Sequence, residues 1–249
     1  MAMNNRVLPI ILLIVFIFLP SKVFAASPPD TSSPDANRIR LKKKNYGYFF
    51  SNSRWPSVKD NKTIIFVCWE KNALAKFPKE VQWVQSAVTE SWETYSRVEF
   101  RGWKACVEGN YGLRIVEYDD GDEKHAPQVK KFGKNLDGVS EGMTLNFTFN
   151  TWKPWKADFK TSENQRELAI RSIAVHEFGH ALGFAHEQDR ADEPGECAEK
   201  TDTKGKDLVY LTPYDINSVM NYCNPKYSNG GNLSKYDIES VQQEYGSPE

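Results

Sequence analysis

The chain has no excess of charge of either sign. Its 249 residues include 32 lysines and arginines and 33 aspartates and glutamates, which gives a formal net charge of −1. No basic stripe stands out, and the short run Lys42–Lys44 is typical of a solvated tail or a processing site. We therefore expect neither a nucleic-acid partner nor a membrane-surface partner.

Long apolar runs are also scarce, and the one near the N-terminus predicts a signal peptide. Val7–Leu19 follows the positive residue Arg6 and is too short to span a bilayer. Small or branched residues stand at the positions expected for cleavage after Ala25, with cleavage after Ala26 as the alternative. No second run supports a membrane anchor, so we expect an exported protein, extracellular or, in a bacterium, periplasmic.

Cysteine is rare, and its four positions favour disulfides over a metal site. No two cysteines have a short ligand spacing, and an even number in an exported chain is typical of disulfide pairing. Three pairings are possible. We favour the one that keeps each pair on one side of the histidine motif described below, namely Cys68–Cys106 and Cys197–Cys223.

The length and local patterns predict a single domain. About 220 residues remain after residue 25, with no internal repeat. Residues 26–54 are interpreted as a flexible tail or short pro-segment, because their first part is rich in Pro, Ser and Asp, and residues 55–249 as the domain. Apolar periodicity predicts strands and helices. The strands are Thr63–Trp69, Arg97–Trp103, Leu113–Tyr118 and Met143–Asn150, and the helices are Glu80–Tyr95, Glu163–Leu182 and Ser234–Tyr245.

Histidine is rare as well, yet three of the four histidines fall in one motif, H-E-x-x-H-x-x-G-x-x-H. His176 and His180 are four residues apart, so on a helix they share one face. Gly183 allows the chain to leave the helix in a left-handed conformation, and the turn then returns His186. Three histidine ligands leave a fourth position open, which is typical of catalytic zinc. Glu177 is placed to contact a zinc-bound water.

The motif predicts hydrolysis by an activated water. Bound water at such a site falls in pKa from about 16 towards about 7, and Glu177 would act as general base. No serine or cysteine nucleophile motif is present. A chance match and a degenerate, inactive relative are the alternatives, but every position of the motif is intact.

The zinc motif and a later block resemble the metzincin metallopeptidases, and most closely the astacins. The third histidine is followed by Glu187-Gln188-Asp189-Arg190, and Ser218-Val219-Met220-Asn221-Tyr222 resembles the Met-turn. By this resemblance Met220 lies beneath the zinc, and Tyr222 contacts the metal at rest and the transition state. The C-terminal residues 233–246 resemble the last helix of matrixins and astacins. Asn221, where astacins carry His, and the absence of a cysteine before Cys68 depart from these families.

The resemblance implies an α+β fold. We expect a twisted mixed sheet of about five strands on two long helices, and a smaller C-terminal subdomain ending in a helix. It further implies a monomeric enzyme that binds protein or peptide in extended form along an edge strand, for which Met143–Asn150 is the candidate. Asn224–Tyr227 is the candidate wall of a selectivity pocket, and Glu187 would meet the N-terminus released by processing.

We therefore interpret the chain as a secreted zinc-dependent endopeptidase, with His176, His180 and His186 as metal ligands and Glu177 and Tyr222 as catalytic residues. One alternative is a zinc amidase acting on non-protein amides such as cell-wall peptides. Another is a non-catalytic relative that keeps zinc, against which the intact Glu177 argues.

Overall fold

The computed structural model describes residues 48–151, 162–195, 197 and 207–249. The predicted signal peptide (1–25) and the predicted tail up to residue 47 lie outside these residues. In the described part of the chain, no helix is both long and apolar enough to cross a bilayer.

The core of the fold is a mixed sheet of five strands in the order β3-β2-β4-β6-β5. Strands β2, β3, β4 and β6 are parallel to one another, whereas β5 pairs with β6 antiparallel and forms one edge. The predicted mixed sheet and α+β class are thus confirmed. The strands are β2 (Thr63–Trp69), β3 (Val98–Ala105), β4 (Leu113–Glu117), β5 (Gln128–Val129) and β6 (Met143–Leu145).

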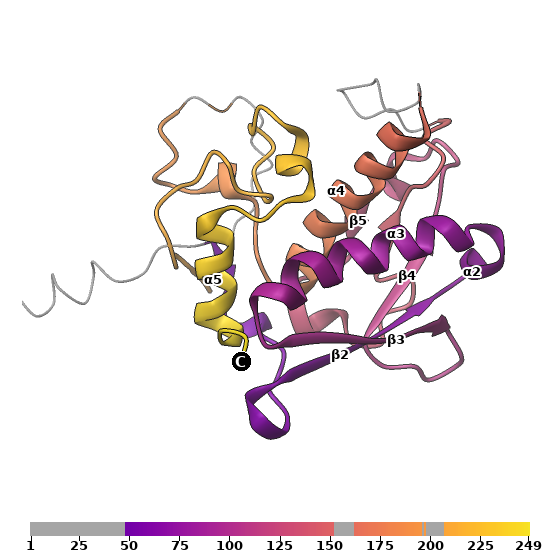
Figure 1. Cartoon of the computed structure of the whole chain (residues 1–249), viewed down its shortest axis with the longest axis horizontal. Coiled ribbons are helices and arrows are strands. Elements are labelled where there is room, and N and C mark those ends of the chain that lie inside the picture. Colours follow the sequence, from indigo (N-terminus) through magenta and orange to yellow (C-terminus); the bar gives the residue numbers. More distant parts are fainter. Residues whose placement is uncertain (1–47, 152–161, 196, 198–206) are drawn as a thin grey trace, which may run out of the picture. The chain divides into compact units, whose positions relative to one another are not determined.

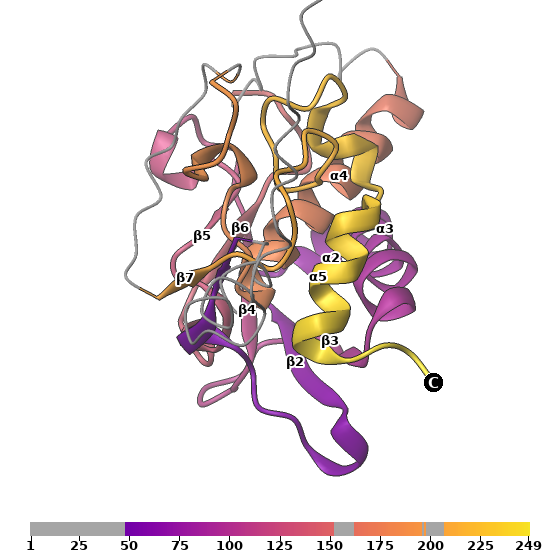
Figure 2. The ribbon, with the colours of Figure 1, turned by 90° about the vertical axis from the view of Figure 1, so that its left-hand side faces the viewer.

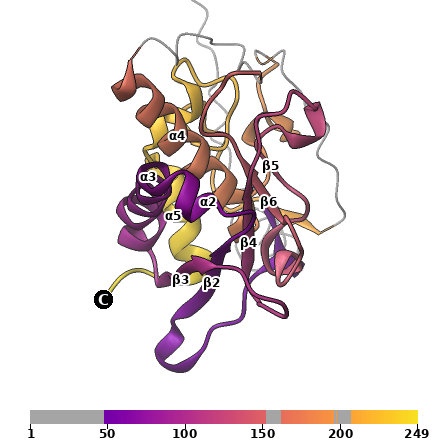
Figure 3. The same cartoon turned by 90° about the vertical axis from the view of Figure 1, so that its right-hand side faces the viewer.

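Two helices cover one face of this sheet. Figures 1 and 3 show α3 (Pro78–Val88) and α4 (Glu163–Leu182) side by side, with the strands beneath them. The predicted Glu80–Tyr95 helix is α3 followed by a π-helical turn over Thr89–Glu93, whereas α4 has the predicted bounds. The indole of Trp92 donates a hydrogen bond to Val175 O at 2.9 Å and so joins the two helices.

The opposite face of β2 meets solvent. Ile65 and Val67 are buried, while Phe66 between them is 57% exposed. This alternation follows from the two-residue period of a strand that is covered on one side. Each fully buried apolar side chain contributes about 1.5–3 kcal/mol.

The last predicted strand is shorter than expected and lies inside the sheet. β6 ends at Leu145, and Thr144 and Asn146 are as buried as their apolar neighbours. Asn146 Oδ1 accepts the backbone N–H of Thr148 at 3.1 Å and of Phe149 at 2.8 Å, which turns the chain out of the strand. Since β6 pairs with β4 on one side and β5 on the other, the prediction of Met143–Asn150 as the edge strand is wrong.

The folded unit includes residues that the sequence had assigned to the tail. β1 (Phe49–Phe50) pairs antiparallel with β7 (Leu208–Val209), and Phe49 is fully buried. Ala185 N–H donates to Tyr48 O at 2.7 Å, so this segment lies against the turn between the second and third histidines of the motif.

The C-terminal part has little regular structure before its final helix. α5 (Lys235–Tyr245) begins with a capping box between Ser234 and Asp237, as the sequence predicts, and is prominent in Figure 2. The Tyr245 hydroxyl lies at 2.5 Å from Leu182 O and joins α5 to the end of α4. The remaining helical segments are α2 (Ala73–Lys76), η1 (Ser51–Ser53), η2 (Lys59–Asn61), η4 (Glu123–His125), η5 (Gly133–Leu136), η7 (Glu187–Asp189) and η8 (Tyr227–Gly231).

Both predicted disulfides are confirmed. Cys68–Cys106 joins the end of β2 to the residue after β3, and Cys197–Cys223 closes a separation of 26 residues. The second bond links the segment after the histidine motif to the segment after Met220.

Candidate metal centre

The local sequence determines where α4 begins and ends. Ser162 caps its N-terminus by accepting the Gln165 N–H at 3.3 Å. Gly183 ends it with φ 108°, a conformation that favours glycine. A Cβ at this position would also lie 2.7 Å from the Phe49 ring. The chain therefore turns sharply after Leu182 and returns His186 toward the helix.

This turn brings the three motif histidines together. His176 Nε2 lies 3.2 Å, and His180 Nε2 3.0 Å, from His186 Nε2. In a tetrahedral site with Zn–N bonds of about 2.0–2.1 Å, two nitrogens lie about 3.3–3.4 Å apart. Among the described residues, these three histidines form a group whose ligand atoms all lie within 4.8 Å of one another and so could hold a metal ion.

The other ring nitrogens fix the tautomers of two of these histidines. His176 Nδ1 lies 2.8 Å from Val219 O, and His180 Nδ1 lies 2.7 Å from Phe184 O. Because a carbonyl can only accept, both Nδ1 atoms carry the hydrogen and both Nε2 atoms present lone pairs. Both lone pairs point to His186 Nε2, and three imidazole nitrogens at this spacing are a donor set that fits a zinc ion.

Burial keeps the three rings in the neutral form that binds metals. It lowers the pKa of His176 to about 4, and it lowers the pKa of His180 and His186 well below the usual value of 6.5. At neutral pH the site therefore holds three uncharged imidazoles.

Glu177 is a buried carboxylate beside these rings. It is 4% exposed, and its Oε2 has no hydrogen-bond partner among the described residues. Burial raises its pKa to about 8, and a cation held by the histidines would lower that pKa again. A buried, unsatisfied oxygen at this position is suited to accept a proton from a water.

The Met-turn lies directly below and beside the triad. The Tyr222 ring stacks on His176, with centroids 5.1 Å apart, and lies 4.5 Å from the His186 ring. Met220 is buried, and a Cβ added to Gly179 would lie 2.3 Å from Met220 Sδ. The structure thus brings Glu177, Met220 and Tyr222 together with the histidines, as the sequence predicts.

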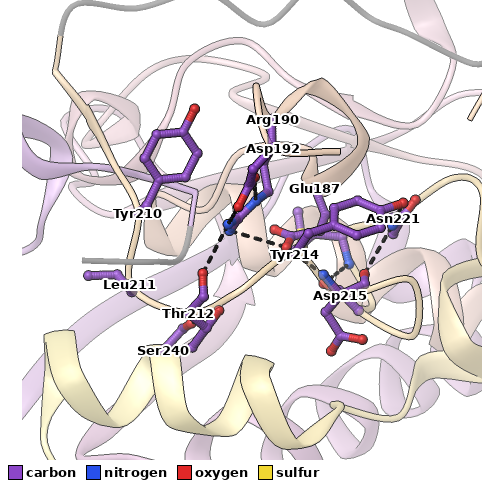
Figure 4. A network of polar contacts seen from close by, with 12 residues as sticks. Glu187, Arg190, Asp192, Tyr210, Leu211, Thr212, Tyr214, Asp215, Asn221 and Ser240 are labelled. Atoms are coloured by element: carbon purple, nitrogen blue, oxygen red, sulfur yellow. Dashed lines mark hydrogen bonds and ion pairs between the residues drawn. The ribbon is translucent and has the colours of Figure 1, made fainter. Parts of the chain in front are cut away.

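A buried ion-pair network holds the segment that follows His186 (Figure 4). Arg190 is 2% exposed, pairs with Glu187 Oε1 at 3.2 Å and contacts both oxygens of Asp192 at 2.8 Å. Glu187 Oε1 also accepts the Asp215 N–H at 3.0 Å. Arg190 also donates to Thr212 O at 3.0 Å, so the network joins two loops, a role that no signal in the sequence indicates.

Asn221, the departure from the astacin pattern, is completely buried beside this network. Its amide nitrogen donates to Tyr214 Oη and to Asp215 O, both at 3.0 Å, and its oxygen accepts the Cys223 N–H at 2.9 Å. Asn221 therefore stabilises the Met-turn through contacts of its own.

Of two aromatic residues near the site, the sequence predicts one and gives no signal for the other. Phe132 meets the His180 ring edge-on, with centroids 5.1 Å apart, and no motif marks it in the sequence. Tyr227 belongs to the predicted pocket wall, and burial and the nearby charge of Glu177 raise the pKa of its hydroxyl. The wall segment thus reaches the neighbourhood of Glu177.

A helix that supplies two histidines and a glutamate, with a third histidine returned by a turn, defines the class of zinc-dependent peptidases. A family model of the matrixins matches residues 59–193, and a model of the astacins matches residues 165–247. No curated protein sequence is significantly similar to the chain.

Solved structures share the fold, among them the following two. The chain is 18% identical to myroilysin, with a TM-score of 0.53 over 82% of this chain and 100% of that one. It is 17% identical to high choriolytic enzyme 1, a hatching enzyme zinc-protease of the medaka fish Oryzias latipes, with a TM-score of 0.51 over 80% and 96% of the two chains.

The matrixin match covers more than half of the chain, which therefore belongs to the matrixins, a metzincin family of zinc metallopeptidases, and is related to the astacins. The predicted resemblance to metzincins and the prediction of a zinc metalloendopeptidase are confirmed. Its substrates are proteins or peptides.

Proposed function

We propose that the chain is a secreted zinc endopeptidase in which His176, His180 and His186 bind the metal and Glu177 is the general base. The observation that carries this proposal is the convergence of three Nε2 atoms at 3.0 and 3.2 Å, with two of the Nδ1 atoms committed to carbonyl oxygens. Two lone pairs thus face His186 Nε2, and a hydrogen on that nitrogen could pair with only one of them at a time, whereas a single cation can bind all three nitrogens.

A zinc ion bound there would supply a water of lowered pKa and a positive charge for the substrate carbonyl oxygen. Glu177 accepts the proton of the attacking water at its buried Oε2 and then donates it to the leaving amine. Tyr222, held against His176 and His186, donates a hydrogen bond from its hydroxyl to the developing oxyanion.

The substrate binds as an extended strand along β5 rather than along Met143–Asn150. Support comes from the topology, because β5 is the edge strand beside β6, and from Phe132, which joins the chain after β5 to His180. An edge strand binds a peptide through its backbone. Selectivity then comes from pockets, for which Asn224–Tyr227 remains the candidate wall. We expect a monomer.

Export rests on the N-terminal sequence and on the disulfides. Residues 1–25 have the pattern of a signal peptide, and the two disulfides are typical of proteins from oxidising compartments.

The test combines metal analysis with three variants. We expect one zinc per chain in the wild-type protein and in Glu177→Gln, with turnover of Glu177→Gln reduced about 10²- to 10⁴-fold. His186→Ala should lose both metal and activity. The matched control is His125→Ala, which removes the one histidine outside the motif. Zinc retained by His186→Ala, or full turnover in Glu177→Gln, contradicts the proposal.

The choice of polymer is tested with the same proteins. Digestion of casein by the wild-type enzyme and not by Glu177→Gln supports a protein substrate. Release of peptides from peptidoglycan without casein digestion would instead identify a cell-wall amidase.

A further inference from the structure

A pair of aromatic rings extends from the candidate metal centre to a neighbouring pocket. Phe132 meets His180 on one side, and its ring centroid lies 4.5 Å from that of Phe50 on the other. The two rings are in contact, both are only half-buried, and both line the same pocket.

Backbone packing holds this pair in place. Phe50 N–H donates to Gly183 O at 3.0 Å, which ties β1 to the end of α4. Gly133 has φ 54°, and a Cβ there would lie 1.9 Å from Ser53 O, so the backbones that carry the two phenylalanines touch. These contacts hold the two segments that line the pocket close to each other.

Two phenylalanine rings form the apolar part of the lining, and the other residues that line the pocket are polar or charged. The cavity has a volume of ≈ 380 Å³, which falls within the usual range for ligand sites. The lining includes one cation and one anion, so it has no net charge that would favour a charged group. The lining residues are Phe50, Asn52, Ser53, Lys131, Phe132, Asn135 and Asp207.

The path of the substrate leads to this pocket. β5 ends at Val129, and the chain continues past His180 through Phe132 to the pocket. Antiparallel pairing is the more stable arrangement, and it puts the N-terminal part of a peptide beside the C-terminal end of β5. A peptide with its cleaved bond at the histidines would therefore place residues preceding that bond near Phe50 and Phe132.

We infer that this pocket, named here the Phe50–Phe132 pocket, binds a large apolar side chain of the peptide substrate at a position N-terminal to the cleaved bond. The inference rests on the proposed function. It adds a second source of selectivity, which acts on residues before the cleaved bond and is separate from any preference for the residue after that bond. The ligand is aromatic or aliphatic because the two phenylalanine rings offer it an apolar contact surface and the two charges of the lining balance each other.

The experiment measures kcat/KM on a peptide library in which each position on either side of the cleaved bond is varied. For the wild-type enzyme we expect Phe or Leu to be preferred over Gly at one N-terminal position by at least about tenfold. In Asn135→Trp the exposed asparagine at the pocket becomes a bulky ring that fills it, so that ratio should fall toward one. Phe50→Ala removes a wall and should also lower the ratio, which provides a second test if one variant folds poorly.

Matched controls separate the pocket from general effects. Asn164→Trp alters an exposed asparagine in the first turn of α4, sixteen positions before His180 and so about 24 Å along the helix. Phe66→Ala removes a phenylalanine that is 57% exposed on β2. Both controls should retain the wild-type ratio and activity.

The outcomes distinguish this inference from the proposed function. A wild-type enzyme that cleaves peptides without an apolar preference before the bond overturns the pocket and leaves the peptidase standing. The same holds if both pocket variants keep the wild-type ratio, or if the ratio changes only at positions after the bond. A zinc-loaded enzyme that cleaves no peptide overturns both.

Discussion

Gly179→Ala tests how closely the Met-turn packs beneath the zinc helix. Gly179 lies inside α4 between Glu177 and His180, and its helical conformation is one that alanine adopts easily. A Cβ there would lie 2.3 Å from Met220 Sδ, 3.2 Å from Met220 Cε and 3.1 Å from Trp92 Cζ2. The Met220 side chain must therefore move when the methyl group is added.

Two opposing effects set the size of the change. Replacing glycine by alanine within a helix stabilises it by about 1 kcal/mol, whereas overpacking a core costs about 1–3 kcal/mol. We expect the clash to prevail, so that Gly179→Ala lowers the free energy of unfolding by up to about 2 kcal/mol. In a Met220→Ala background the sulfur is gone, and the same change should raise the free energy of unfolding by up to about 1 kcal/mol.

The assay is denaturant unfolding of the metal-free protein with disulfides intact, for the two single variants and the double variant. The expected coupling between positions 179 and 220 is about 1–3 kcal/mol. Gly109→Ala is the control, since a Cβ there meets no atom within 4 Å and its cost should be equal in both backgrounds. If Gly179→Ala has the same sign with and without Met220, the contact does not determine the requirement for glycine.

Three further predictions concern catalysis, the disulfide and pH. Tyr222→Phe keeps the ring contacts but loses the hydroxyl, so kcat should fall about 10²-fold with little change in KM; a change confined to KM contradicts the proposed role. Replacing Cys197 and Cys223 by serine should lower the free energy of unfolding by ~3 kcal/mol and weaken zinc binding, as measured by competition with a chelator. Removing the Cys68–Cys106 disulfide should affect stability more than zinc binding. Burial raises the pKa of Asp237 from 3.8 to about 6, so in this interval the native state binds a proton that the unfolded state has released. The resulting stabilisation is fully present below about pH 4 and is lost as the pH rises through 6. The difference in unfolding free energy between the metal-free wild-type protein and Asp237→Asn should therefore change between pH 4 and 6.5, by at most about 3 kcal/mol, and a constant difference refutes the linkage.

Local signals in the sequence determine most of the secondary structure. Glu163–Leu182 has the predicted bounds because a serine cap precedes it and a glycine follows it. Thr63–Trp69 is a strand as predicted, since β-branched and aromatic residues favour a pleated, covered surface. Both signals lie within the element or next to it, so neither depends on the tertiary fold.

Sheet topology depends on distant parts of the chain, and there the sequence was misleading. Met143–Asn150 alternates like a half-exposed strand, yet its strand β6 pairs with another strand on each side, β4 and β5. The edge strand beside it, β5, consists of only Gln128 and Val129 and is too short for any periodicity to appear. Phe132 was missed for the same reason, because its importance comes from a contact with His180, 48 positions later.

The motif specifies which atoms could bind zinc, but the tertiary fold determines whether their lone pairs point to the metal site. His176 presents Nε2 because Val219, 43 residues away, directs its carbonyl at Nδ1. That carbonyl is held in turn by Asp237 of α5, whose Oδ2 accepts the Val219 N–H at 2.9 Å and whose Oδ1 accepts the Ser218 hydroxyl at 2.6 Å. A second chain with the same eleven-residue motif and no such acceptor would leave His176 free to adopt either tautomer. The zinc affinity of this site should therefore depend on α5 as well as on the histidines, even though no residue of α5 is among the three that could hold the metal.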